Sequence, residues 1–422
     1  MANETELNEM VNPTSNTAIT TLVLLSGAGY EQATAILEKM GAKKEAVIRE
    51  VNSDDMMRRV SDIVRELRYV ALNRTIDESG FQTLLDLPCG YTPKVFEFTD
   101  KGMHYIGCDL PAVINDFTPI IDSIVDENQK KRIDFVVVDV TNYGSMKAAA
   151  DKAEGPVCIA TEGLTVYLNP NEKFLLMQNI RKILSEKGGC WLNADVETLE
   201  YYMAVFRAVD GEHAGDLWAA TSKIFTGQSD TNMRQNASDV FSGKRSGNGE
   251  SLKVDYEKIE AEYKKAGFVV EKVPYYRDDF KLHLYGEMSA KEISDLRENI
   301  KHVNIWKITP DPDFSQKADD ILEKCGVDSK QMDSNLPFEV KSELSDGVFT
   351  VSIQGRLDSI TSPELLKQFQ KAGNSIEAIH MDASRLEYIS SAGLRVLHMM
   401  HDSLMNKDNF EITGCQFDLG FG

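Results

Sequence analysis

Carboxylate residues follow apolar runs in the first half of the chain, each at the point where a run ends. The first run ends in the turn DLPCG, residues 86–90, where Gly90 allows the backbone to approach a ligand closely. The next run ends in Asp109, nineteen residues beyond Gly90, and an acid there can accept hydrogen bonds from both hydroxyls of a ribose. The spacing therefore predicts a nucleoside site beyond the carboxyl ends of parallel strands.

Two further run ends carry carboxylates. Asp139 precedes Val140, and this pair suits adenine because the carboxylate accepts a hydrogen bond from the exocyclic amine while valine covers the ring. Glu162, followed by Gly163, is placed for the methionine end of an adenosyl ligand. A single acid at a strand end is more often a helix cap, but a turn followed by three acids fits an adenosyl ligand without phosphates. A dinucleotide would need G-x-G-x-x-G for its pyrophosphate, so an NAD-dependent oxidoreductase is disfavoured.

Short apolar runs alternate with amphipathic segments from residue 84 to residue 309. This alternation is typical of an α/β fold, in which helices cover both faces of a mostly parallel sheet. The polar, glycine-rich stretch at residues 227–250 is expected to be a loop or insertion facing the substrate. The expected strands are TLLDLP near residue 84, MHYIGCDL near 104, IDFVVVDV near 134, GPVCIATEG near 156, GCWLNADV near 190, and later GFVVEKVPYY and HVNIWKIT.

The first eighty residues are predicted to be helical. The expected helices are TAITTLVLLSGAG, YEQATAILEKM and SDDMMRRVSDIVRELRYVAL. The last of these has apolar residues three and four apart and Ser53 as a candidate N-cap. We expect the helices before residue 70 to cover the ligand crevice as a lid.

A second α/β unit is predicted near the C-terminus. Prolines and polar residues after Thr309 indicate a linker with one short helix. Beyond it come the strand pair FEVKSELSDGVFTVSIQG, the helix SPELLKQFQKAG, the strand AIHMDAS, the helix SAGLRVLHMMHDSLM and the strand NFEITG. The chain is thus divided into a helical cap (1–80), a large α/β domain (81–309), a linker (310–336) and a small α/β domain (337–422).

Four segments of the large domain resemble motifs of a known family. DLPCGYTPKVFEF, YIGCDLP, FVVVDVTNY and ATEGLTVYLNPNEKFLLMQNI are similar to those of the leucine carboxyl methyltransferase and polyketide O-methyltransferase family, over roughly residues 60 to 308. The resemblance implies a Rossmann-like seven-stranded methyltransferase sheet, S-adenosyl-L-methionine as cofactor and S-adenosyl-L-homocysteine as product. The cofactor-binding residues that it implies are Arg74 (cofactor carboxylate), Asp86, Pro88, Gly90 (methionine moiety), Asp109 and Leu110 (ribose), Asp139 and Val140 (adenine), Glu162 (amino group) and Gly163.

The first turn departs from the family pattern. The usual D/E-x-G-x-G-x-G is reduced to a single glycine, and Pro88 replaces the first of them, so weaker cofactor affinity is expected. The chain is therefore either a methyltransferase or a signalling protein that binds the cofactor or its product without methyl transfer.

Methyl transfer from a sulfonium is an in-line displacement, so most of the acceleration comes from positioning and from excluding water. A carboxylate acceptor, with a pKa of about 4, is already an anion at neutral pH, whereas a hydroxyl acceptor needs a general base. The acceptor is expected to be a small molecule or a protein. Candidate catalytic residues are Tyr167, Asp195 and Tyr276, and lesser candidates for the substrate side are Glu197, Tyr275 and Arg277.

The small domain resembles a STAS domain, the fold of anti-sigma-factor antagonists, through VSIQGRLDSITSPEL and MDASRLEYISSAGLRVL. The resemblance implies that Ser391, next to Ser390, is phosphorylated by a partner kinase. A phosphate is well tolerated at a helix N-terminus, although either serine could equally be an N-cap. The last expected strand is followed only by FDLGFG after Gln416, so the domain is expected to be short.

Composition narrows the classes of partner and location. The 46 basic and 67 acidic residues give a formal net charge of -21, which disfavours nucleic acid and anionic membranes. The 6 cysteines stand singly, without the spacing of metal ligands, so no metal site is expected. No segment reads as a membrane span or a signal peptide, and a cytoplasmic location is expected.

Overall fold

The structure is a computed structural model that describes residues 7, 10, 11, 15–41, 55–211, 255–314, 336–373 and 375–415. The chain forms two compact units. The larger consists of residues 16–109 and 113–315, and the smaller of residues 1–15, 110–112 and 316–422. The expected loop at 227–250, the expected cap at Ser53 and the expected linker helix lie outside the described residues.

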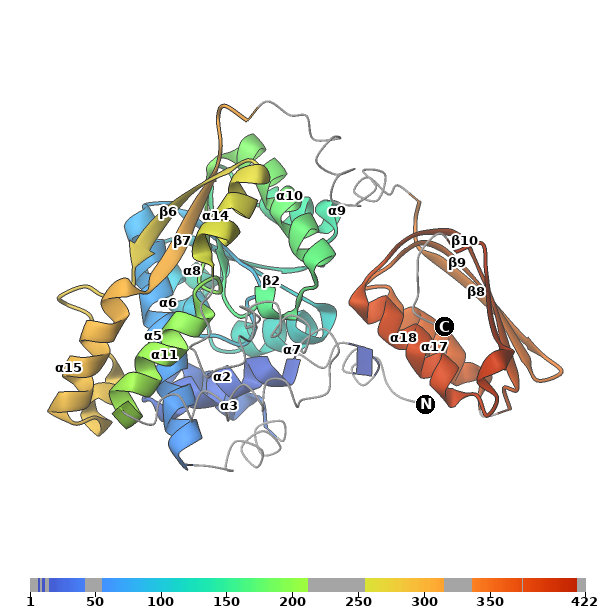
Figure 1. The fold of residues 1–422 in the computed structure, drawn as a ribbon, viewed down its shortest axis with the longest axis horizontal. Helices are drawn as coiled ribbons and strands as arrows, with labels where there is room; N and C mark the ends of the chain where they lie inside the picture. The colour runs from blue at the N-terminus through green and yellow to red at the C-terminus, as the bar shows by residue number, and fades with distance from the viewer. Residues whose placement is uncertain are drawn as a thin grey trace. The chain divides into compact units, whose positions relative to one another are not determined.

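The larger unit is built on a seven-stranded sheet with the strand order β3-β2-β1-β4-β5-β7-β6 (Figure 1). β1 to β5 are parallel, whereas β7 runs antiparallel to both of its neighbours. This is the Rossmann-like methyltransferase sheet expected from the sequence, and every expected strand is present. The strands are β1 (Thr83–Asp86), β2 (His104–Asp109), β3 (Ile133–Val137), β4 (Val157–Thr161), β5 (Gly189–Asn193), β6 (Phe268–Pro274) and β7 (Asn304–Pro310).

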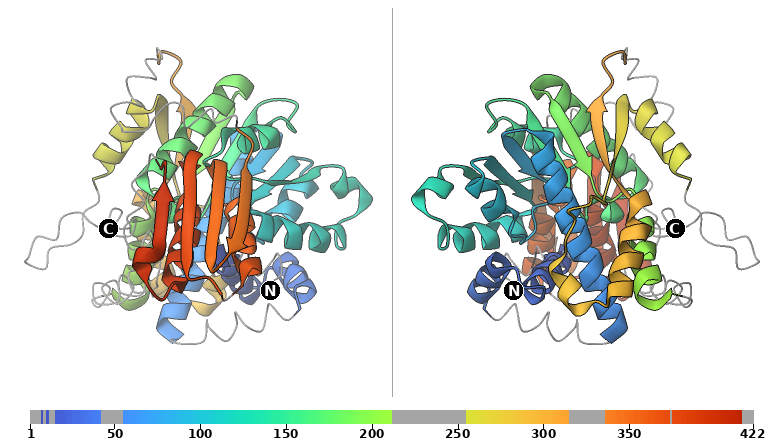
Figure 2. Two further views of the ribbon diagram at one scale, coloured as in Figure 1. Left: turned by 90° about the vertical axis from the view of Figure 1, so that its right-hand side faces the viewer. Right: turned by 90° about the vertical axis from the view of Figure 1, so that its left-hand side faces the viewer.

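Helices cover both faces of this sheet, as Figure 2 shows. Successive strand residues point to opposite faces, so Leu84 and Leu85 of β1 belong to two different apolar clusters. Burial on both faces explains why the strands read as continuous apolar runs. One face carries α5 (Asp55–Ser79), α6 (Lys94–Asp100), α7 (Pro111–Asp122), α11 (Thr198–Asp210) and α15 (Ala290–Asn299), and the other carries α9 (Tyr143–Ala150), α10 (Pro170–Lys187) and α14 (Tyr256–Lys265).

Two N-terminal helices, α2 (Ser15–Gly27) and α3 (Glu31–Lys39), join the first of these clusters. A buried carboxylate fixes them to the rest of the unit. Glu66 of α5 accepts a hydrogen bond from the hydroxyl of Tyr30 at 3.0 Å and another from the backbone N–H of Leu284 at 3.1 Å. Burial raises the pKa of Glu66. The cap helices are therefore an integral part of the larger unit.

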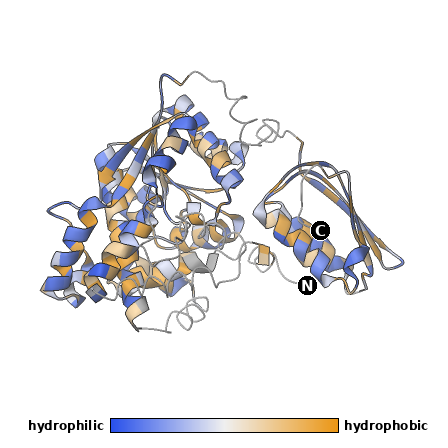
Figure 3. Cartoon of the chain, viewed as in Figure 1, coloured by the Kyte–Doolittle hydropathy of each residue, from blue (hydrophilic) through white to orange (hydrophobic). Residues whose placement is uncertain are grey.

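The smaller unit has a four-stranded sheet with the order β11-β10-β9-β8, and α17 and α18 lie on one of its faces (Figure 1). Apolar and polar residues interleave along both helices, as expected for helices with one buried face (Figure 3). Leu7 and Val11 also belong to the apolar core of this unit. The elements are β8 (Glu339–Ser345), β9 (Val348–Leu357), α17 (Ser362–Ala372), β10 (Ala378–Ile389), α18 (Ser391–Ser403) and β11 (Phe410–Thr413).

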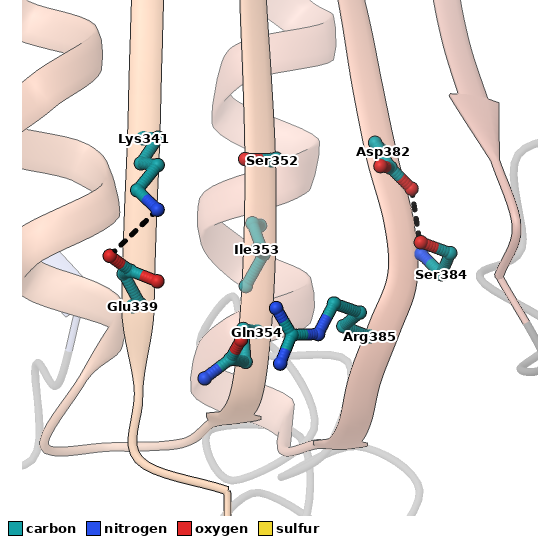
Figure 4. A pocket seen from close by; sticks show the side chains of 8 residues that line it. All are labelled: Glu339, Lys341, Ser352, Ile353, Gln354, Asp382, Ser384 and Arg385. Carbon is teal, nitrogen blue, oxygen red and sulfur yellow. Dashed lines mark hydrogen bonds and ion pairs between the residues drawn. The ribbon is translucent and has the colours of Figure 1, made fainter.

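The outer face of the smaller sheet holds a shallow polar hollow of about 60 Å³. Its lining residues come from β8, β9 and β10 (Figure 4). Ile353 among them also belongs to the apolar core of the unit. Sites for drug-sized ligands measure about 300–1,000 Å³, so the hollow has room only for a few water molecules. It is lined by Glu339, Lys341, Ser352, Ile353, Gln354, Asp382, Ser384 and Arg385.

Candidate functional site

The carboxyl ends of β1 to β5 lie along one edge of the larger sheet because these strands are parallel. Backbone hydrogen bonds continue past the strand ends and hold the following turns together. The N–H of Cys89 donates to Cys108 at 2.9 Å, and the N–H of Val138 donates to Asp109 at 2.9 Å. The sheet therefore places at one edge the acids that follow its strands: Asp86, Asp109, Asp139, Glu162 and Asp195.

The turn after β1 is tied directly to the acid that ends β2. The backbone N–H of Gly90 donates to Oδ2 of Asp109 at 2.8 Å, and Gly90 has a positive φ of 52°. A Cβ at this position would lie 3.3 Å from the Cβ of Ala18 in α2. The first cap helix therefore lies against the turn. The Asp109 carboxylate thus fixes the position of the turn, and Leu110 follows it directly.

The turn after β3 is held by its own carboxylate. Oδ1 of Asp139 accepts hydrogen bonds from the backbone N–H of Thr141 at 2.8 Å and from its hydroxyl at 2.6 Å. The carbonyl of Val140 accepts a hydrogen bond at 2.9 Å from the side-chain amide of Asn179 in α10. Both predicted adenine residues are therefore buried in a turn that is tied to a neighbouring helix.

A buried cluster of four charged side chains joins the ends of β1 and β4. The ammonium of Lys94 lies 3.1 Å from Asp86 and 2.8 Å from Glu162, and the guanidinium of Arg68 lies 2.8 Å from Glu162. The hydroxyl of Tyr105 donates to Asp86 at 2.9 Å. Two cations thus balance two carboxylates in a region shielded from water. Charges in such surroundings interact far more strongly than on the surface.

The cluster changes the proton affinity of its members. Burial would raise the pKa of Glu162, but Lys94 and Arg68 outweigh it and lower that pKa to about 2. Burial would lower the pKa of Lys94, but Asp86 and Glu162 raise it above its usual range. Glu162 is therefore an anion and Lys94 a cation at neutral pH. The pKa of Asp86 is raised by burial, against the attraction of Lys94.

The arginine beside Glu162 is Arg68. The sequence resemblance implied a different arginine, Arg74, as the partner of the cofactor carboxylate. Arg74 donates to the carbonyls of Tyr275 at 2.7 Å and Pro274 at 2.8 Å, where β6 ends. The structure therefore brings Arg68 into the charged cluster and places Arg74 at a different strand end. Both arginines belong to α5, six positions apart.

Asp195, a candidate catalytic residue, holds the turn that follows β4. Its carboxylate accepts hydrogen bonds from the backbone N–H groups of Gly163 at 2.6 Å, Leu164 at 2.8 Å and Thr165 at 2.9 Å. Three such contacts fix the position of Gly163 directly after Glu162. The carboxylate of Asp195 is thus engaged in shaping the turn.

The two candidate tyrosines lie on different segments. Tyr167 ends a short helix, η1 (Thr165–Tyr167), and is half-buried. Tyr276 follows β6, is half-buried, and donates from its hydroxyl to Asp278 at 3.2 Å. Both remain candidates for the substrate side.

The lesser candidates also have structural contacts. Glu197 accepts a hydrogen bond from the indole of Trp306 at 2.8 Å. Tyr275 is fully buried and its hydroxyl donates to the carbonyl of Ala194 at 3.5 Å. Arg277 lies 3.6 Å from Glu78. Glu197 and Tyr275 thus connect β5 and its turn to the β6–β7 side of the sheet.

Sequence reasoning missed Arg68 and Lys94. A signal for Arg68 exists, because Val64 and Leu72, four positions before and after it, are both fully buried apolar residues. An arginine in the apolar stripe of a helix needs a buried partner. Lys94 follows Pro93 at the start of α6, where a cation is unfavourable for the helix dipole unless carboxylates compensate it.

The two serines at the start of α18 occupy different environments. The side chain of Ser390 is buried and accepts a hydrogen bond at 3.3 Å from the backbone N–H of Gly393, so it is the N-cap. Ser391, the first helical residue, is half-buried. The N-cap role thus falls to Ser390, and Ser391 is the more accessible of the pair.

Comparison with known proteins identifies the smaller unit. The profile of a family described as "Mlab, STAS domain" matches residues 340–415. The C-terminal segment is therefore a STAS domain, as expected from its motifs. No curated protein sequence matched the chain.

Several solved structures that are similar to this chain are methyltransferases. A glycopeptide N-methyltransferase, MtfA, in complex with sinefungin is 20% identical over 29% of this chain and 47% of its own, with a TM-score of 0.24. An O-methyltransferase family protein from Burkholderia thailandensis is 12% identical over 61% of this chain and 59% of its own, with a TM-score of 0.32. Human N-acetylserotonin methyltransferase in complex with SAM is 14% identical over 61% of this chain and 56% of its own, with a TM-score of 0.29. The chain thus spans about half of the length of these proteins.

Two further features are absent from the described part of the chain. No helix there combines the length and apolar character that a membrane span requires. Within the same residues, no three histidine, cysteine, aspartate or glutamate side chains come together in a way that could hold a metal ion.

Proposed function

We propose that the larger unit binds S-adenosyl-L-methionine and transfers its methyl group to an oxygen of a small molecule or a protein, and that the STAS domain regulates or localises this activity. One observation carries the proposal. Asp109, Asp139 and Glu162 lie at the same edge of a seven-stranded sheet with the strand order β3-β2-β1-β4-β5-β7-β6. The proposal includes the more specific assignment that the larger unit is of the leucine carboxyl methyltransferase type.

The strand-end residues fit the nucleoside part of the cofactor. Asp109 would accept hydrogen bonds from the ribose hydroxyls, and its contact with Gly90 would hold the turn close to the sugar. Asp139 would accept a hydrogen bond from the adenine amine, with Val140 against the ring. None of these roles requires a phosphate-binding loop.

The charged cluster fits the methionine part, which is a zwitterion. Glu162 would pair with its ammonium and Arg68 with its carboxylate, since these two side chains already lie within 2.8 Å of each other. Lys94 would keep Glu162 ionised and correctly placed. Gly163 would allow close approach after β4 because no side chain projects there. The cofactor, when bound, supplies a methyl group on a cationic sulfur, which keeps the electron pair of the broken S–C bond as the new O–C bond forms.

The acceptor that best fits these contacts is a carboxylate. The two candidate bases at the end of β5, Asp195 and Glu197, are committed to hydrogen bonds that shape the fold. Among the described residues that follow β1, β2, β3, β4 and β5 within their turns, none is a histidine. A carboxylate acceptor is already an anion at neutral pH and needs no base. The chain's residues would then contribute by orienting the acceptor and excluding water.

The same commitment of Asp195 and Glu197 favours one other function. Without a base, methyl transfer to a hydroxyl would be slow. If the chain transfers no methyl group, the larger unit would act as a sensor of the cofactor or its product. In that case the STAS domain would report ligand binding to a signalling partner.

One pair of measurements separates these functions. Calorimetry with S-adenosyl-L-methionine and S-adenosyl-L-homocysteine tests binding, and transfer of a tritiated methyl group to a panel of carboxylic acids and alcohols tests catalysis. Binding with transfer supports the enzyme, and binding without transfer supports the sensor. Failure of both ligands to bind would contradict both functions.

The two arginines of α5 give a matched test of the methionine end. Arg68→Met is expected to weaken binding of S-adenosyl-L-methionine by roughly ten-fold or more, because a charge-assisted pair with the cofactor carboxylate is lost. Binding of 5′-methylthioadenosine, which lacks the amino acid part, should be unchanged. Arg74→Met serves as the control and should leave both affinities near wild type. A larger loss in Arg74→Met would favour the assignment made from the sequence resemblance.

For the STAS domain we propose that Ser391 is the phosphorylation site of a partner kinase. Ser391 is half-buried, whereas Ser390 is occupied as the N-cap. Ser391→Asp is expected to change the amount of a signalling partner recovered in a pull-down, since a negative charge then stands at the helix N-terminus. Ser391→Ala is the control for loss of the hydroxyl. Equal recovery with all three proteins would contradict this role.

A further inference from the structure

The apolar core of the smaller unit contains two residues from the opposite end of the chain. Leu7 and Val11 are 2% and 0% exposed, and they share one apolar cluster with residues of α17 and α18. Residues 7, 10 and 11 are helical, and positions four apart lie on one side of a helix. We refer to Leu7, Met10 and Val11 as the N-terminal strap.

Polar contacts join the strap to both helices of the STAS domain. Arg395 of α18 donates a hydrogen bond to the backbone carbonyl of Val11. The side-chain amide of Gln370 in α17 lies 3.7 Å from the sulfur of Met10. The Met10 side chain is 41% exposed, so it does not belong to the buried side of the strap. The strap therefore contacts α17 and α18 through both apolar and polar groups.

We infer that the face formed by α17 and α18 is a helix-binding surface and that the chain's own strap is its resident occupant. Two apolar side chains at i and i+4, flanked by a contact from each STAS helix, are the kind of anchors with which an amphipathic helix binds an apolar surface. Any competing partner must present the same pattern. Binding of such a partner and of the strap would then be mutually exclusive.

The strap is continuous in sequence with the cap of the larger unit. Only three residues, 12–14, separate Val11 from the start of α2. Ala18 of α2 lies against the turn at Gly90. Release of the strap is therefore expected to loosen α2. Any effect of a loosened α2 on cofactor binding rests on the proposed function. The binding surface on α17 and α18 does not depend on that function.

Hydrogen exchange on the full chain tests the surface without any cofactor. The double variant Leu7→Gln/Val11→Gln removes the apolar anchors and should speed amide exchange in α17 and α18 by roughly ten-fold or more. Exchange in β1 to β5 should stay at the wild-type rate. Met10→Gln is the matched control, because it makes the same kind of change at an exposed position of the strap. Equal exchange in α17 and α18 for wild type and the double variant would overturn the inference.

A peptide provides the second measurement. A labelled peptide of residues 1–14 should bind the double variant, whose surface is vacant, and fail to bind wild type at micromolar concentration. A tethered segment has an effective concentration on the order of millimolar, which the free peptide cannot match. The same peptide with both glutamine changes should bind neither protein. Equal binding of the native peptide to wild type and variant, or binding to neither, would overturn the inference. None of these readouts depends on methyl transfer, so they fail or succeed independently of the proposed function.

Discussion

Lys94→Met is expected to lower the free energy of unfolding of the larger unit by about 3–5 kcal/mol. The Lys94 side chain is 1% exposed and lies between Asp86 and Glu162. Its removal leaves two buried carboxylates, of which Glu162 keeps its contact with Arg68. Methionine retains much of the volume, so the loss measures the charge rather than a cavity. Urea unfolding at pH 7, followed by tryptophan fluorescence, reports on the right unit because all 3 tryptophans lie in it.

Lys101→Met is the matched control for this experiment. Lys101 directly follows α6, the helix that begins with Lys94, and also contacts two carboxylates, Asp77 at 2.5 Å and Glu97 at 3.0 Å. Its side chain is 41% exposed, so its loss should cost at most about 1 kcal/mol. If the two variants lost the same small amount of stability, the buried cluster would contribute no more than a surface ion pair.

Asp109→Ala is expected to weaken binding of both S-adenosyl-L-methionine and S-adenosyl-L-homocysteine by at least roughly ten-fold. The substitution removes the acceptor for the ribose hydroxyls and also the contact that holds the N–H of Gly90. Isothermal calorimetry at constant salt measures the effect. Wild-type affinity in Asp109→Ala would contradict the ribose assignment.

Two companion variants separate binding from the shape of the turn. Asp109→Asn keeps an oxygen that can accept from Gly90 but loses the negative charge, so it should fold like wild type and still bind the ligands more weakly. Asp134→Ala changes an acid at the opposite edge of the same strands, where it pairs with His104 at 2.9 Å and Lys152 at 3.2 Å. Asp134→Ala should leave the affinity unchanged. A loss of affinity in Asp134→Ala equal to that in Asp109→Ala would point to a general loss of folding.

The strands and their ends were predictable because local physics determines both. A strand buried on both faces must be mostly apolar, as in VCIAT of β4, and a charged residue such as Glu162 marks where the strand ends. Parallel strands then carry their ends to one edge without further information. Asp109 and Asp139 could therefore be assigned to a shared edge from the sequence alone.

The charged cluster was less predictable. It depends on the direction in which side chains leave α5 and on pairing between residues far apart in the sequence. Arg68 and Arg74 are six positions apart on α5, which at 3.6 residues per turn rotates their side chains by about 240° relative to each other. Motif similarity pointed to Arg74 for the cofactor carboxylate, and only the fold shows that the side of the helix carrying Arg68 meets Glu162. The pairing of Lys94 with Glu162 joins two different strand ends, and spacing along the chain carries no sign of it.

The N-terminal strap was not predicted for the same reason. Leu7, Met10 and Val11 have helical spacing, but three apolar residues in an acidic stretch are too short a pattern to predict a buried helix. Their partners lie in the last domain of the chain. A contact of this range leaves no trace in local periodicity.

The N-terminal strap is synthesised long before the domain that it packs against, and this delay affects folding during synthesis. Val11 and Arg395 are in contact although they are 384 positions apart. At about 5–20 residues per second, Val11 is added to the chain roughly 20–80 s before Arg395. During that interval Leu7 and Val11 are unshielded on the nascent chain and open to chaperones. The C-terminal domain, in turn, completes its core only by capturing a segment that was translated first.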